Sequence, residues 1–80
     1  MEGQLLLSFA RILGVSDQEI VHLTHVDRQM ISAWDSLAHI QLYVAASEYL
    51  GTEIEFGIFM NLRRLDEILK FVSESNENSP

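Results

Sequence analysis

Asp35, Ser36 and His39 are the residues of this sequence whose types and spacing could carry chemistry. A serine hydroxyl is a weak nucleophile until a base or a metal activates it, and a histidine oriented by a carboxylate is a common base. On this reading the three residues would be the catalytic group of a small serine hydrolase. A chain of 80 residues gives no grounds for oxyanion donors or a substrate pocket, so hydrolysis is the weakest reading and we expect no catalytic residues.

His22 and His25 are spaced so that one helical turn could present both to a metal ion. Zinc normally takes four ligands, and no third ligand is evident beside these two. The sequence has no cysteine, so neither a thiolate site nor a disulfide is expected. We therefore predict no metal site and interpret both histidines as loop residues.

The first half of the chain must position Ser36. Apolar residues at helical spacing predict a helix from Gln4 to Leu13, ended by Gly14. The stretch Ser16 to Glu19 has the form of a capping box and predicts a short helical turn. No period holds from Thr24 to Ala33, which predicts a long irregular connection, and long loops are often functional.

The best-defined helix runs from Ser36 to Leu50, with Asp35 as its N-cap and Gly51 at its end. Helical spacing places one apolar set toward the core, consisting of Leu42, Tyr43, Ala46, Tyr49 and Leu50, with Ala38 and His39 near its edges. The opposite side carries Ser36, Leu37, Ile40, Gln41, Val44 and Glu48. Because this side is also partly apolar, the helix needs something to pack against on both faces.

The last third of the chain predicts a loop from Thr52 to Gly57, a single helical turn from Ile58 to Asn61, and a final amphipathic helix ending near Ser73. Polar residues without aromatics follow, so we expect residues 1–73 to form one domain and residues 74–80 a flexible tail. Arg63-Arg64 precedes the last helix. The pair either leaves that helix less well capped or touches an acidic partner.

The stretch Trp34-Asp35-Ser36-Leu37 at the head of the longest helix resembles the acyl and peptidyl carrier proteins. Their Asp-Ser-Leu motif opens the second of four helices, and the similarity extends from Leu5 to Val72. Further matching positions are Ala38, His39, Ile40, Leu42, Leu50, Gly51 and Ile54. The resemblance implies an all-α four-helix bundle with a long first loop and a short third helix. Trp34 is expected to pack beneath the helix start.

This resemblance implies that Ser36 is the attachment point for 4′-phosphopantetheine, which a separate phosphopantetheinyl transferase takes from coenzyme A. The start of a helix favours an anion there, and Asp35 would cap the helix and present charge to the transferase. The thiol of the arm would carry acyl or aminoacyl groups as thioesters. The protein would then be a carrier and not an enzyme. Without its neighbours, Ser36 could simply be a capping residue.

Carriers dock on their enzymes through this helix, which implies that Leu37, Ile40, Gln41, Val44 and Glu48 bind partners. These partners would be the transferase, an acyl- or aminoacyl-loading ligase or transferase, and downstream synthases. Fatty-acid carriers have several acids on this helix, whereas Gln41 and Ser47 occupy two such positions here. A dedicated secondary pathway therefore fits better than housekeeping fatty-acid synthesis. The alternative is an unloaded carrier-like module that binds partner helices through the same face.

The formal charge of −7 comes from twelve acidic and five basic residues. It argues against nucleic acid and anionic membranes, which need clustered cations, and favours basic partners. The longest apolar run, Leu42 to Ala46, is far shorter than the roughly 20 residues of a membrane span. The N-terminal residues show no export signal. We expect a cytoplasmic protein, and we expect it to be a monomer.

Overall fold

The computed structural model of this protein describes residues 2–77. Its elements are α1 (Glu2–Leu13), α2 (Asp17–His22), the 3₁₀ turn η1 (Arg28–Met30), α3 (Ser36–Leu50), α4 (Phe56–Met60) and α5 (Leu65–Glu77). Over residues 2–77 there is no strand, which confirms the all-α fold class. The described residues form five α-helices where four were predicted, because the capping box at residue 16 starts a full helix, α2.

The first helix begins at Glu2, two residues before the predicted start, and ends at Leu13 as predicted. Gly14 follows in the left-handed conformation, with φ of 72°. The Ser16 hydroxyl accepts a hydrogen bond from the backbone N–H of Glu19 at 3.0 Å, which confirms the cap of α2. His22 is the last residue of α2, so its prediction as a loop residue was wrong.

Helix α3 has the predicted bounds, since its two ends are determined by local chemistry. The Asp35 carboxylate caps its start, and Gly51 ends it in the left-handed region with φ of 71°. The predicted irregular connection before it is broken by η1, whose first turn is capped by Asp27.

The last two helices are longer than predicted. Helix α4 begins at Phe56, because the Glu55 carboxylate accepts hydrogen bonds from the backbone N–H groups of Gly57 and Ile58. Helix α5 ends at Glu77 and not near Ser73. Residues 74–77 of the predicted tail are therefore helical, and residues 78–80 lie outside the described residues.

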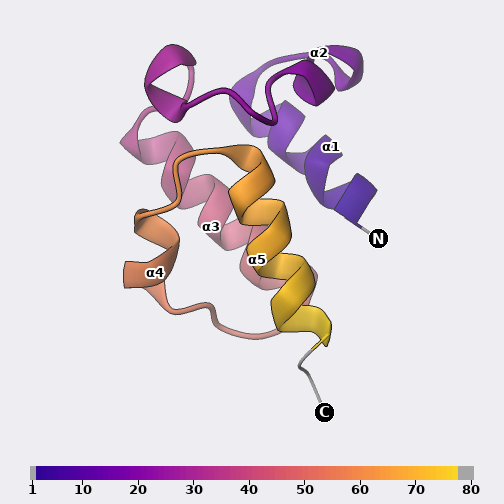
Figure 1. The fold of residues 1–80 in the computed structure, drawn as a ribbon, viewed down its shortest axis with the longest axis vertical. Coiled ribbons are helices and arrows are strands. Elements are labelled where there is room, and N and C mark those ends of the chain that lie inside the picture. Colours follow the sequence, from indigo (N-terminus) through magenta and orange to yellow (C-terminus); the bar gives the residue numbers. More distant parts are fainter. Residues whose placement is uncertain (1, 78–80) are drawn as a thin grey trace.

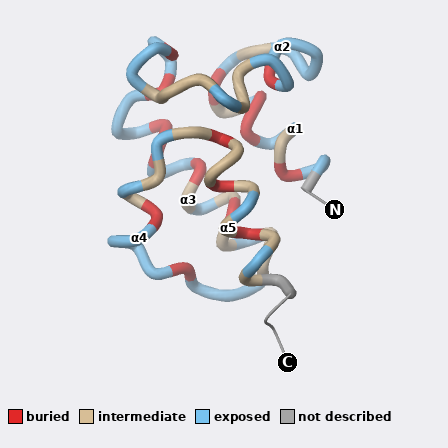
Figure 2. The backbone as a smooth tube through the Cα atoms, viewed as in Figure 1, coloured by how far each residue is buried: buried red, intermediate tan, exposed pale blue. Residues whose placement is uncertain are grey.

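The core lies where α1, α3 and α5 meet, with α4 against α3 and α2 against α1 (Figure 1). Every α-helix contributes buried positions (Figure 2). Fully buried apolar side chains are Phe9, Ile20, Leu42, Ala46, Phe59, Leu65, Ile68 and Val72. The described helices include none long and apolar enough to cross a bilayer.

The buried face of α3 is rotated relative to the prediction. Ala38 and His39 are buried, although they were placed at the edges of the core face. Tyr49 and Leu50 pack against the core on the predicted side of the helix, but they are only partly buried. The physical reason is α4, which packs beside the N-terminal half of α3 and covers His39 with Phe59.

Candidate functional site

Ser36 is the first residue of α3, and it is exposed. Asp35 caps the helix, since its Oδ1 accepts a hydrogen bond from the backbone N–H of Ala38 at 2.8 Å. The Ser36 hydroxyl is not the cap, and it forms no hydrogen bond with the part of the chain that the structure describes. The hydroxyl is therefore presented to solvent at the positive end of a 15-residue helix.

The side of α3 next to Ser36 is exposed and partly apolar. We call Leu37, Ile40, Gln41, Val44 and Glu48 the α3 face; all five are exposed, as predicted. The exposed fractions of Leu37, Ile40 and Val44 are 65%, 42% and 46%. Their helical spacing aligns them in one strip. Contiguous exposed apolar surface is typical of interaction sites.

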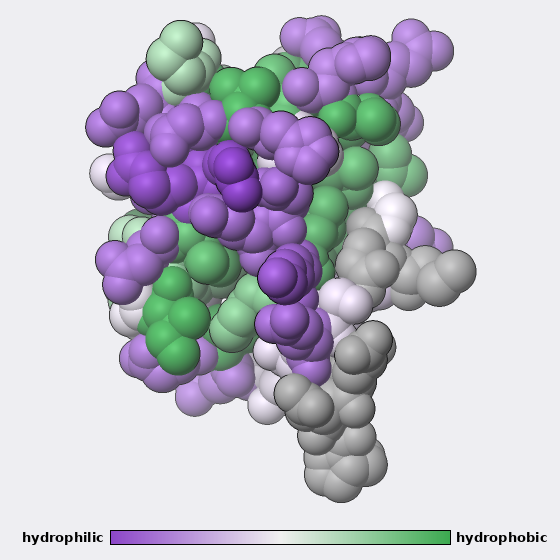
Figure 3. Space-filling view, in the orientation of Figure 1, coloured by the Kyte–Doolittle hydropathy of each residue, from purple (hydrophilic) through white to green (hydrophobic). Residues whose placement is uncertain are grey.

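Exposed apolar residues continue on α4, where Phe56 and Ile58 are about half exposed. The Phe56 ring meets the ring of Tyr43 on α3 edge to face, with centroids 5.0 Å apart. Figure 3 shows hydrophobic side chains gathered over α4. Sequence reasoning missed Phe56 and Ile58 because it assigned Phe56 to a loop. The available signal for an earlier helix start was Glu55, an acidic residue that caps α4.

His39 lies in the core and joins three elements. The Trp34 indole N–H donates a hydrogen bond to His39 Nδ1 at 2.9 Å, so Nδ1 carries no proton. Nε2 lies 3.0 Å from the carbonyl oxygen of Phe59, to which it can only donate. The imidazole is therefore neutral, and neither nitrogen is free to take a proton from Ser36. The burial of Trp34 agrees with the sequence analysis.

Acidic pH should destabilise this protein through His39. Burial holds the pKa of the imidazole below its ordinary value of 6.5, and the charge of Arg28 in η1 adds to this, while the hydrogen bond to the Phe59 carbonyl opposes it. The unfolded chain therefore binds this proton at higher pH than the folded protein. The stabilising contribution is complete above about pH 6.5 and is lost progressively as the pH falls below that value.

This contribution should decline by at most about 1.4 kcal/mol per pH unit. Urea unfolding of wild-type protein from about pH 7.5 to about pH 5.5 should show the decline, and a His39→Gln variant should lack it. Equal slopes in the two proteins would contradict the prediction.

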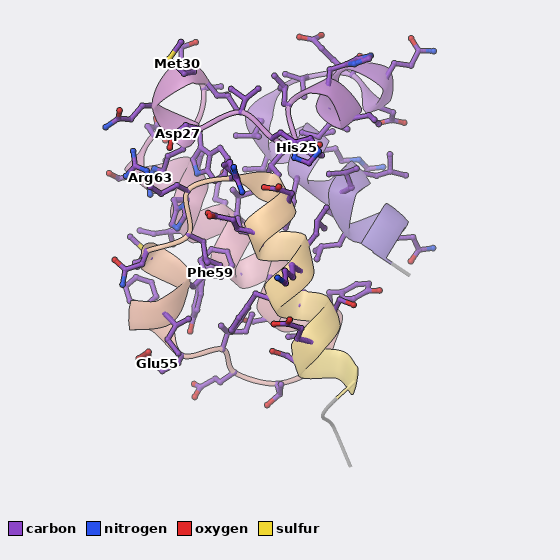
Figure 4. The ribbon with its side chains drawn as sticks, in the orientation of Figure 1. His25, Asp27, Met30, Glu55, Phe59 and Arg63 are labelled. Carbon is purple, nitrogen blue, oxygen red and sulfur yellow. The ribbon has the colours of Figure 1, made fainter. Side chains whose placement is uncertain are left out.

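A polar junction of His25, Asp27, Arg63 and Asp66 ties the first connection to the start of α5. The Arg63 guanidinium donates to both carboxylate oxygens of Asp27, at 2.9 and 3.0 Å (Figure 4). This pairing lowers the pKa of Asp27. His25 Nδ1 lies 2.9 Å from Asp66 Oδ2. These contacts hold the connection between α2 and α3 against the start of α5.

The two arginines before α5 have a role that the sequence analysis did not consider. Arg63 pairs within the chain, and the backbone N–H groups of Arg63 and Arg64 both donate to Glu67 Oε1. Glu67 therefore satisfies two backbone donors at the start of α5, where the sequence analysis had left open whether the arginine pair weakens the cap or touches an acidic partner. Arg64 Nε also lies 3.1 Å from Asp66 Oδ1.

An open hollow of about 250 Å³ lies between α1 and the C-terminal part of α3. Its lining residues are Gln4, Leu5, Ser8, Ala45, Glu48 and Tyr49. It is on α3 but at the end opposite Ser36. Within the described residues, no three acidic, histidine or cysteine side chains come together to hold a metal ion.

Comparisons of this chain with protein-family models, curated proteins and solved structures found no match. The fold and the site define the class of protein by geometry. It is a small all-helical protein that displays a serine hydroxyl at the start of its longest helix. Beside that serine lies an exposed apolar face.

Proposed function

We propose that this protein is a free-standing carrier of the acyl and peptidyl carrier type, with 4′-phosphopantetheine attached to Ser36. In this proposal α1, α3, α4 and α5 are the four helices of the family's bundle, and α2 and η1 lie within its long first loop. The order of elements supports this plan, because a long connection precedes the serine-bearing helix and a short helix follows it. The protein is a substrate for other enzymes and not itself an enzyme.

The observation that carries the proposal is the exposed hydroxyl of Ser36 beside an independent cap. Asp35 satisfies the backbone N–H of Ala38, so the serine is free to be modified without loss of the cap. The helix start favours a phosphodiester at this position by about 0.3–1 kcal/mol. The same carboxylate is also available to present charge to the transferase.

The modification is a phosphoryl transfer. Ser36 Oγ attacks the phosphorus of coenzyme A that bears the pantetheine group. The bond from that phosphorus to the oxygen of the adenosine half breaks, and adenosine 3′,5′-bisphosphate leaves. The hydroxyl proton passes to a base of the transferase, whose Mg²⁺ stabilises the developing charge. The arm then supplies the thiol that this cysteine-free chain lacks, and cargo is held as a thioester.

The α3 face is the proposed docking surface for the transferase, a loading ligase or transferase, and downstream synthases. Glu48 is the one charged residue among its five, so recognition is mainly apolar. Elsewhere Asp27 and Asp66 are paired with cations of the same chain. The charge of −7 serves solubility and encounter with basic enzymes, in a monomeric cytoplasmic protein.

The cargo belongs to a dedicated secondary pathway in this proposal. Gln41 and Ser47 stand where fatty-acid carriers have acids, and Gln41 lies exposed on the α3 face. A housekeeping synthase that binds acidic side chains along this helix would have only Glu48 to bind. Amino-acid, hydroxy-acid, polyketide or lipid-tailoring enzymes are the better matches for an apolar face.

Incubation with coenzyme A, Mg²⁺ and a promiscuous phosphopantetheinyl transferase should add one phosphopantetheine unit to the protein. Intact mass spectrometry measures the gain, and fragmentation of the digested product should place it on Ser36. An unchanged mass, or a modification at another residue, would overturn the proposal. An unchanged mass would favour the alternative, in which the exposed α3 face binds a partner helix and Ser36 is never loaded.

A further inference from the structure

The bridge formed by Trp34, His39 and Phe59 connects the segment before α3, α3 itself and α4. All three side chains are buried. The indole and imidazole rings are nearly parallel, with centroids 5.8 Å apart and planes at 20°. The Phe59 ring is the second aromatic neighbour of His39, and the centroids of the two rings are 5.1 Å apart. The ring contact with Phe59 and the two hydrogen bonds together hold the imidazole in one orientation.

Ser36 lies inside the loop that this bridge closes. Trp34 stands two residues before Ser36 and His39 three residues after it, so their hydrogen bond joins the two ends of a short stretch that contains the site. Within that stretch, the Asp35 carboxylate bonds to the Ala38 N–H and the Asp35 carbonyl accepts from the His39 N–H. The direction in which Ser36 presents its hydroxyl therefore depends on where Trp34 is held.

We propose that His39 is a positioning residue for the modification of Ser36, acting through Trp34 and without contact to the reacting atoms. This inference rests on the proposed function. Attack on phosphorus requires the hydroxyl oxygen to lie in line with the bond that breaks, and small misplacements cost about 10- to 100-fold in rate. A bridge that fixes Trp34 limits such misplacement. The link to the Phe59 carbonyl also fixes α4 relative to the site.

His39→Gln and Trp34→Phe test this inference from the two ends of one hydrogen bond. Glutamine offers an N–H near the position of Nε2 and so keeps a donor for Phe59, but it leaves Trp34 without its acceptor. Phenylalanine keeps an aromatic ring and removes the indole donor. With each variant as the substrate, the kcat of the transferase should fall by about tenfold. KM should stay at the wild-type value, because the α3 face is intact.

The double variant should lose no more than either single variant, because both remove the same bond. His25→Gln is the matched control, since that histidine belongs to the polar junction and is predicted to load at the wild-type rate. Circular dichroism at the assay temperature must show that each variant is folded. The inference would be overturned if both folded variants kept the wild-type kcat or if only KM rose. It would also be overturned if the fold-losses in kcat of the two single variants multiplied in the double variant. Failure of wild-type protein to load would instead overturn the proposed function, and the inference with it.

Discussion

A Ser36→Ala variant should gain no mass with coenzyme A, Mg²⁺ and transferase under conditions that load the wild-type protein completely. The reason is that the alanine methyl group has no oxygen to attack phosphorus, and the proposal makes Ser36 the single acceptor. The fold should be unaffected, because Asp35 supplies the cap and alanine is a good helix former. The free energy of unfolding should therefore change by no more than about 0.5 kcal/mol.

Ser32→Ala is the matched control for this result. Ser32 is also exposed and lies four residues earlier, so its removal should leave loading at the wild-type rate. Intact mass measures loading, and urea unfolding followed by circular dichroism measures stability. If the mass gain persists in Ser36→Ala, another residue is the acceptor. If the variant is strongly destabilised, loss of loading says nothing specific about the hydroxyl, and the structural account of Asp35 as cap is wrong.

Leu42→Ala should cost about 2–5 kcal/mol of unfolding free energy. Leu42 has no exposed surface and belongs to the cluster in which α3 contacts α1 and α5. Truncation removes buried methyl groups and leaves a cavity that rigid neighbouring helices close only in part. An 80-residue domain has about 4–12 kcal/mol of stability in total, so this loss is a large share of it.

Val44→Ala is the matched control on the same helix. Val44 is 46% exposed, so its truncation should change the unfolding free energy by no more than about 0.5 kcal/mol while weakening the binding of the transferase. Urea midpoints of the two variants give the comparison. A wild-type midpoint for Leu42→Ala, or a loss of the same size for Val44→Ala, would mean that the helix is rotated relative to the structure.

Elements with strong local signals could be predicted from the sequence. Asp35 and Gly51 determine both ends of α3, because a carboxylate cap and a left-handed glycine act within one helical turn. The same holds for Gly14 and Ser16 around α2. Exposure of the α3 face was also predictable, since helical spacing separates it from Leu42. The end of α5 was predicted too early because its local signal is weak. No glycine or proline stops this helix before Glu77.

Contacts between residues far apart in the chain could not be predicted. Arg63 and Asp27 are 36 residues apart, and nothing in either local stretch indicates that they form an ion pair. The burial of His39 likewise depends on Phe59, which is 20 residues away. The helical period placed His39 only at the edge of the core, because it contains no information on where α4 packs.

The sequence by itself determined the all-helical class, the bounds of α3, the exposed serine at its start and the acidic balance of the chain, since each depends on composition or on interactions within a few residues. Only the tertiary structure decided the rotation of α3, the neutral bridge of His39 and the polar junction that holds the first connection. The physical reason is that hydrogen bonds and ring contacts between distant segments form only after the helices have packed, and packing is set by the shape of the whole core.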